Sequence, residues 1–196
     1  NETDSFAFFT CFAVFLSEPH IFLFTAKNKR AGANTRRKHK KGEIKMQLTQ
    51  KENGLLDDMI ESEKLCIEKY KKHSDAAIDG QLKGLFSNLS DLETKHLQSL
   101  DSIKSGTVPS VQSGSKAAMP SFQSVYSPAP SQDKSTDMFL CSDALSGEKH
   151  VSHLYDTGIF EFRDENVRNV LNHIQKEEQQ HGKMIYDYMS ANNMYC

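Results

Sequence analysis

The sequence predicts an all-α protein, a four-helix bundle made of two similar helical hairpins with a long crossover between them. Three observations lead to this prediction. Apolar residues recur every three or four positions in four segments. A Ser- and Pro-rich stretch at 105–137 separates these segments into two pairs. The two pairs also carry the same polar residues in the same order, as expected for a duplicated hairpin.

Residues 1–45 differ from the rest and are expected to form a leader, disordered or translated from non-coding sequence. Both apolar runs in this segment are shorter than the roughly 18–20 residues that span a bilayer. The basic TRRKHKK follows them, the reverse of a secretory signal. Codons for Lys40-Lys41-Gly42-Glu43 can contain a bacterial ribosome-binding sequence, so translation is expected to begin at Met46. A signal anchor and a basic nucleic-acid arm are the rival interpretations.

Composition excludes several other classes of protein. Residues 46–196 carry 22 acidic and 15 basic side chains, a net charge of −7 that suits nucleic acid poorly. Neither nucleic acid nor a membrane is therefore an expected partner. The four cysteines (11, 66, 141 and 196) form no C-x-x-C pair, which excludes a zinc ribbon, and their scatter is not that of a disulfide framework. No Gly-rich phosphate loop, G-x-S-x-G or Rossmann motif is present.

The elements follow in order along residues 46–196. The first hairpin, 46–104, is predicted to contain helices at 48–77 and 80–104, and a flexible linker, 105–137, comes next. The second hairpin, 138–193, is predicted to contain helices at about 137–158 and 165–191. Asp79 and Asp164 precede the second helix of each hairpin and suit an N-cap, because a carboxylate accepts free N–H groups of the first turn.

Each predicted helix has an apolar stripe that a glutamate interrupts. The stripes are Leu56, Met59, Glu63, Cys66 and Tyr70; Leu82, Phe86, Leu89, Glu93, His96, Leu100 and Ile103; Cys141, Ala144, Glu148, Val151 and Tyr155; and Val167, Leu171, Ile174, Glu178, His181, Ile185 and Tyr188. Two stripes thus add a histidine one turn after the glutamate. A shift of 85 residues superimposes the two hairpins with eight identities in 42 positions, these polar residues among them.

The glutamates of each hairpin are expected to meet at one level. Glu63 comes 16 residues before Asp79 and Glu93 comes 14 after it, and the second hairpin repeats both spacings. At 1.5 Å per residue the levels agree to within about one turn. Four carboxylates and two imidazoles should therefore converge inside the bundle.

Buried carboxylates without partners cost several kcal/mol each, so this convergence predicts bound cations. The predicted metal ligands are Glu63, Glu93, His96, Glu148, Glu178 and His181, the ligand set of di-iron and di-manganese carboxylate bundles. Two Fe or Mn ions would neutralise the four charges, and zinc would also bind. The alternative is a degenerate site whose polar groups bond to one another or to water.

Other polar residues near the stripes carry weaker expectations. Tyr70 and Tyr155 are either second-shell partners or a radical relay, or else ordinary core tyrosines with a satisfied hydroxyl. His173 and Glu177 are expected on the solvated surface.

The segments DMIESEKLCIEKY, FLCSDALSGEKHVSHLYDTGIFEF and NVLNHIQKEEQQHGKMIYDYM, together with the linker, resemble the Coat F family of spore coat proteins from spore-forming Firmicutes. The resemblance covers about residue 48 to the C-terminus. It implies a ferritin-like bundle made in the mother-cell cytoplasm during sporulation and placed in the spore coat, among other coat proteins and copies of itself. Many members keep only part of the ligand pattern, whereas this chain has all six residues.

Two classes of function follow from these observations. The first is a structural spore coat protein that retains a di-metal site. The alternative is a working di-iron or di-manganese oxidase, a peroxide scavenger or an iron-storage protein. No catalytic residue beyond the metal ligands is predicted.

Overall fold

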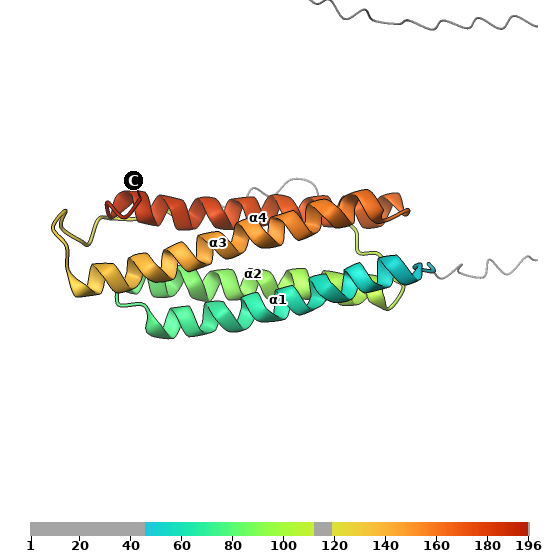
Figure 1. Ribbon diagram of the computed structural model, residues 1–196, viewed down its shortest axis with the longest axis horizontal. Helices are drawn as coiled ribbons and strands as arrows, with labels where there is room; N and C mark the ends of the chain where they lie inside the picture. The colour runs from blue at the N-terminus through green and yellow to red at the C-terminus, as the bar shows by residue number, and fades with distance from the viewer. Residues whose placement is uncertain (1–45, 112–118, 196) are drawn as a thin grey trace, which may run out of the picture. The chain divides into compact units, whose positions relative to one another are not determined.

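The computed structural model describes residues 46–111 and 119–195, and all regular structure within them is helical (Figure 1). The four helices are α1 (Gln50–Ala76), α2 (Gly80–Lys104), α3 (Gln132–Glu161) and α4 (Glu165–Ala191). The predicted all-α four-helix fold is therefore confirmed. The predicted leader, Cys11 and Cys196 lie outside the described residues.

The helices form two antiparallel hairpins, α1 with α2 and α3 with α4 (Figure 1). Between the hairpins, α1 contacts α3 and α2 contacts α4. The start of α3 lies beside the α1–α2 turn (Figure 1). Two hairpins with one long crossover have the connectivity of ferritin-like bundles.

The bounds of α2 and α4 are those predicted, whereas α3 is longer at both ends than the predicted 137–158. It begins at Gln132 because the Ser131 side chain accepts from the Lys134 N–H as an N-cap, inside the stretch predicted as linker. Gly158 does not end the helix. A Cβ at Gly158 would meet the terminal methyl of Met59, so this glycine leaves room for that side chain of α1.

The two predicted N-caps behave differently. Asp164 accepts from two N–H groups in the first turn of α4, as predicted. Asp79 makes no side-chain capping bond. The carboxylate of Asp137, on α3, instead accepts from the backbone N–H groups of Ile78 and Asp79, at 2.8 and 2.9 Å. A residue of the second hairpin thus holds the turn of the first.

The described part of the crossover, within the stretch predicted as a flexible linker, contacts the bundle at several points. Phe122 packs edge-on against Tyr188. The Asn192 side-chain oxygen accepts from the N–H of Val125, and the Tyr126 hydroxyl donates to Asp137. These contacts occur because the crossover runs over the bundle instead of projecting from it.

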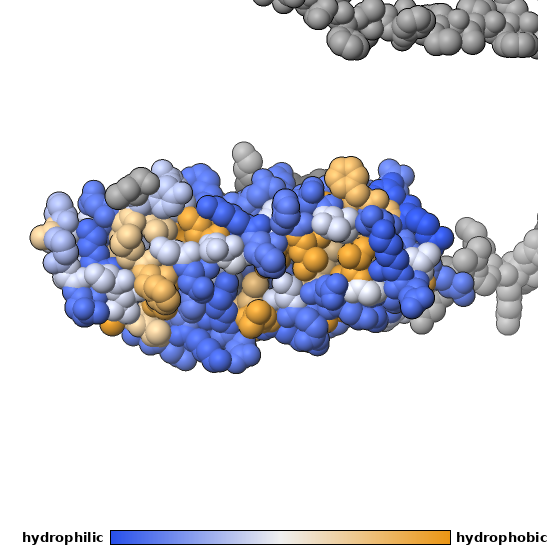
Figure 2. Space-filling view, viewed as in Figure 1, coloured by the Kyte–Doolittle hydropathy of each residue, from blue (hydrophilic) through white to orange (hydrophobic). Residues whose placement is uncertain are grey.

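The predicted stripes form the core. Residues such as Leu82, Phe86 and Leu100 are completely buried. The face in Figure 2 is mostly hydrophilic, with a few separate apolar areas. Phe139 and Phe160 are the most exposed large apolar side chains of the described residues, at 71% and 83%. None of the helices described in 46–111 and 119–195 combines the length and the apolar character that crossing a bilayer requires.

Candidate metal centre

All six predicted ligands lie in the middle of the bundle and are almost completely buried. Their exposed fractions are 0% for Glu63, 0% for Glu93, 3% for His96, 4% for Glu148, 1% for Glu178 and 2% for His181. One glutamate comes from each helix and one histidine from each of α2 and α4. The structure therefore brings together every residue that the helical stripes single out.

Their ligand atoms form two overlapping groups, in each of which the atoms lie within 4.8 Å of one another. We call Glu63, Glu93, His96 and Glu178 the His96 half, and Glu93, Glu148, Glu178 and His181 the His181 half. Glu93 and Glu178 belong to both halves, whereas Glu63 and Glu148 each belong to one. Two carboxylates shared by both groups, with one further carboxylate in each, could hold a pair of cations.

In the His96 half, a single ring nitrogen faces three carboxylates. Nδ1 of His96 lies 2.9 Å from Oε2 of Glu93, 3.0 Å from Oε1 of Glu178 and 3.8 Å from Oε2 of Glu63. One N–H can donate well to one acceptor, and it donates to Glu93. Glu178 Oε1 is close but does not meet hydrogen-bond geometry.

The His181 half repeats this geometry with the second oxygen of each shared carboxylate. Nδ1 of His181 lies 3.1 Å from Oε1 of Glu93, 3.6 Å from Oε2 of Glu148 and 3.7 Å from Oε2 of Glu178. Glu93 and Glu178 thus turn one oxygen toward each histidine. Carboxylates that bridge two cations adopt this orientation.

Several oxygens of the cluster have no hydrogen-bond donor. They are Oε2 of Glu63, Oε2 of Glu148 and both oxygens of Glu178, all of them buried. Buried polar atoms in proteins are nearly always satisfied, because an unmade hydrogen bond costs about 1–3 kcal/mol. Orphaned oxygens that face imidazole nitrogens fit a pair of divalent cations, which would use these lone pairs.

The remaining oxygens of the terminal carboxylates are held by tyrosines of the opposite hairpin. The Tyr70 hydroxyl, on α1, donates to Oε1 of Glu148 on α3. The Tyr155 hydroxyl, on α3, donates to Oε1 of Glu63 on α1. Both tyrosines are completely buried. Each is thus a satisfied core tyrosine and also orients a candidate ligand through a hydrogen bond.

The charges of the metal-free cluster balance through protons. Burial and the neighbouring Glu93 and Glu178 raise the pKa of Glu63 well above its usual value. Burial likewise raises the pKa of Glu148 to about 8. Glu148 is therefore mostly protonated at neutral pH, and the same cause favours the protonated form of Glu63.

The pKa values of the two shared carboxylates and of the two histidines shift in the directions that favour the charged form of each group. Burial alone would raise the pKa values of Glu93 and Glu178, but the adjacent imidazoles of His96 and His181 lower both. Burial alone would lower the pKa values of His96 and His181, yet the surrounding carboxylates raise both well above the usual value. The negative charges of the two carboxylates and the positive charges of the two imidazolium ions then cancel.

Glu177 is a member of this site that the sequence analysis placed wrongly. Its Oε2 lies 3.0 Å from Nε2 of His96, and its side chain is 34% exposed rather than fully solvated. The position of Glu177 in the sequence already indicated this contact. Glu177 directly precedes Glu178 on α4, so it borders the inner stripe and can face the neighbouring helix α2.

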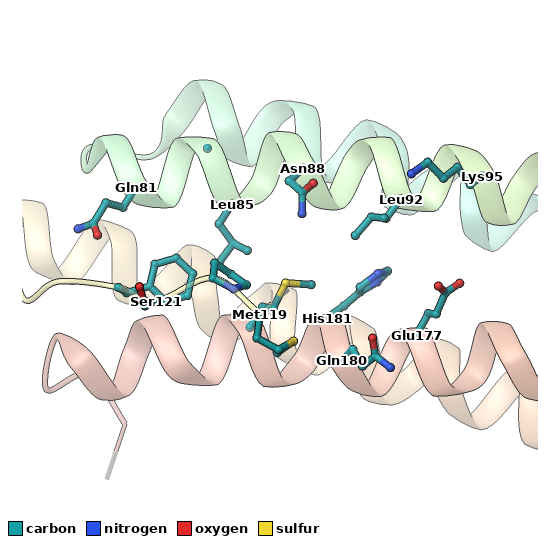
Figure 3. Close-up of a pocket in the computed structure, with 14 residues that line it drawn as sticks. Gln81, Leu85, Asn88, Leu92, Lys95, Met119, Ser121, Glu177, Gln180 and His181 are labelled. Atoms are coloured by element: carbon teal, nitrogen blue, oxygen red, sulfur yellow. The ribbon is translucent and has the colours of Figure 1, made fainter. Parts of the chain in front are cut away.

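Three cavities of the described residues reach the cluster. One, of about 540 Å³, lies between α2 and α4, and His181 lines it together with Leu92, Lys95 and Met119 (Figure 3). Another, of about 570 Å³, lies between α3 and α4, and Glu148 and Glu178 line it. A third, of about 350 Å³, is lined by His96 and Glu177. Small molecules or ions therefore have a route to both halves.

The second hairpin matches a known family of protein domains. Residues 136–195 match the Coat F domain. This match confirms the resemblance drawn from the sequence, over nearly all of α3 and α4. The Coat F match contains Glu148, Glu178 and His181, whereas Glu63, Glu93 and His96 precede it. The complete cluster thus combines the Coat F domain with the hairpin before it.

Other comparisons add little to the Coat F match. No curated protein matches the sequence. A solved structure of the bacterioferritin-related protein from Bacteroides fragilis, described as a dodecameric thioferritin, is similar with 16% identity and a TM-score of 0.42. That similarity covers 71% of this chain and 86% of the other. At this distance it supports no inference about the site or the assembly of this chain.

Proposed function

We propose that the chain is a spore coat protein whose bundle binds two divalent iron or manganese ions. The Coat F match supports the location. The observation on which the metal site depends is the pair of overlapping ligand groups with two shared glutamates and orphaned oxygens. A structural core would gain nothing from four buried carboxylates, since apolar residues of similar volume are usually at least as stable.

In this proposal Glu63 and His96 hold one cation and Glu148 and His181 hold the other, while Glu93 and Glu178 bind both. Each histidine uses Nδ1, the nitrogen that faces the carboxylates. Oxygen and imidazole ligands suit iron and manganese, and zinc also fits them. When bound, a redox-active pair would supply electron transfer to dioxygen or peroxide. Tyr70 and Tyr155 keep the terminal glutamates in place by their hydrogen bonds.

Metal analysis after anaerobic Fe²⁺ loading and desalting tests the metal site. The wild type should retain about two ions per chain, the number that neutralises four carboxylates. Glu93→Ala and Glu178→Ala, which each remove a shared ligand, should retain less than one. Glu61→Ala is the matched control, because Glu61 is 72% exposed and pairs with Lys64 on the surface of α1. A wild type that binds no Fe²⁺, Mn²⁺ or Zn²⁺ would refute the proposal of a metal site.

The coat assignment has its own test. A fluorescent fusion should be made in the mother cell during sporulation and should then form a ring around the spore. The protein should remain with the coat fraction, bound to other coat proteins and to copies of itself. Uniform fluorescence in vegetative cells would contradict this assignment.

A second candidate function is a working oxidase, a peroxide scavenger or an iron store, and the cavity that ends at His181 favours it. Such a protein should consume dioxygen or peroxide in proportion to the bound iron. Loss of that consumption in Glu93→Ala, with full consumption in Glu61→Ala, would support turnover at this site. Two bound ions without any consumption would leave the structural coat function.

A further inference from the structure

The two halves of the cluster differ on the outer side of their imidazole rings. Nε2 of His96 faces the carboxylate of Glu177 at 3.0 Å. Within the described residues, no carboxylate lies within ion-pair distance of Nε2 of His181, and the ring lines the cavity of about 540 Å³ between α2 and α4, which Glu177 also lines (Figure 3). The inner sides of the rings are alike, so the difference between the halves lies in their outer partners.

Glu177 is well placed to hold the His96 ring. It precedes Glu178 on α4, and its side chain is about two-thirds covered. His173, one turn earlier on the same helix, places Nε2 3.4 Å from the same oxygen of Glu177. The carboxylate is therefore held between His96 on its inner side and a half-exposed imidazole on its outer side.

The first hairpin has an apolar residue at the matching position. Leu92 lies 85 residues before Glu177, the same offset that relates His96 to His181. Leu92 and His181 line the same cavity of about 540 Å³, together with Asn88 and Lys95 (Figure 3). A leucine cannot accept a hydrogen bond. Leu92 therefore cannot bond to Nε2 of His181 as Glu177 bonds to Nε2 of His96.

We propose that Glu177 is a positioning residue that makes the His96 half the tighter metal position, filled first, and leaves the His181 half as the exchangeable one. This inference rests on the proposed metal site. An N–H bond from Nε2 to a carboxylate fixes the tautomer that presents Nδ1 to the cation and strengthens its donation. Such outer partners are typically worth about 10–100-fold in metal affinity.

Anaerobic titration with Co²⁺ against a competing chelator measures the two steps separately. The wild type should show two unequal dissociation constants. Glu177→Gln should weaken the tighter step by about 10–100-fold and leave the weaker one within about threefold. Glu177→Asp should recover part of the loss, and Glu61→Gln should behave as the wild type. Equal steps in the wild type, or no effect of Glu177→Gln, would overturn the inference.

Single-site backgrounds assign the steps to residues. With His181→Ala, which leaves the His96 half, Glu177→Gln should still weaken Co²⁺ binding. With His96→Ala, it should have no further effect, because the partner that it positions is gone. The reverse pattern would overturn the inference even if both constants changed.

Proton NMR of the Co²⁺-loaded protein gives a readout that does not depend on affinity. A cobalt-bound imidazole shows a strongly shifted N–H signal when that proton exchanges slowly. One such signal is expected, from Nε2 of His96, and Glu177→Leu should abolish it. Two equal signals would contradict the asymmetry. A wild type that binds no Co²⁺ at all would refute the proposed metal site itself, a result distinct from two equal positions.

Discussion

Loading the cluster with two divalent cations should displace about four protons near neutral pH. In the metal-free site, burial raises the pKa values of Glu63 and Glu148, and the surrounding carboxylates raise those of His96 and His181, so all four groups favour their protonated forms. Two dications replace these four positive charges without changing the net charge of a buried site. The exchange is therefore electrically neutral.

The magnitude follows from this stoichiometry. Each cation competes with about two protons, so its apparent affinity should fall about 100-fold for each unit that the pH decreases below 8. Raised pKa values give this sign, since the groups hold their protons throughout that range and give them up only to a cation. Above about pH 8, Glu148 is already ionised in the metal-free protein, and the dependence should become shallower. Glu93 and Glu178 contribute nothing near neutrality because their pKa values are lowered.

Calorimetric titration with Mn²⁺ at pH 7, in buffers that differ in ionisation enthalpy, counts the protons directly. The wild type should release about four protons for two ions, and Glu148→Gln should release about three for the ions that it still binds. Glu61→Gln should match the wild type. Release of fewer than about two protons by the wild type, with both ions bound, would show that the metal-free cluster is already ionised. The proposed charge-neutral replacement of four protons by two dications would then be wrong.

Three further predictions concern stability in the metal-free protein, measured by urea denaturation with the exposed Glu61→Ala as control. Tyr155→Phe removes a donor to Glu63 and should cost about 1–3 kcal/mol; an unchanged value would mean that water replaces the hydroxyl. Burial alone would raise the pKa of Glu52, but backbone N–H groups and other donors outweigh this effect and lower the pKa from 4.5 to about 2. Because the partner Arg163 is 67% exposed and solvent screens the pair, Glu52→Ala should cost about 1–3 kcal/mol at pH 7. Because the folded pKa is the lower one, this cost should be full above pH 4.5 and vanish as the pH falls through 2; a cost independent of pH would contradict the assignment. Asp137→Ala leaves two N–H groups of the α1–α2 turn without an acceptor and should cost about 1–3 kcal/mol for each, whereas a loss no larger than the control would exclude this role.

The sequence alone was enough to predict the helices and to identify the six candidate ligands. An α-helix repeats every 3.6 residues, so a glutamate that keeps step with leucines must share their buried side. Equal spacing from each hairpin turn then places Glu63 level with Glu93, and Glu148 level with Glu178. These relations are local to one hairpin, and the structure agrees with them.

The relations between hairpins required the tertiary structure. The exchange of partners, in which Tyr70 reaches Glu148 and Tyr155 reaches Glu63, depends on how α1 and α3 lie against each other. The same is true of Asp137, which holds a turn that lies 58 residues earlier in the chain. Glu177 was misplaced for the same reason. Helical periodicity places Glu177 at the border of the apolar stripe. Whether its side chain faces solvent or Nε2 of His96 depends on how α2 and α4 are offset and rotated against each other.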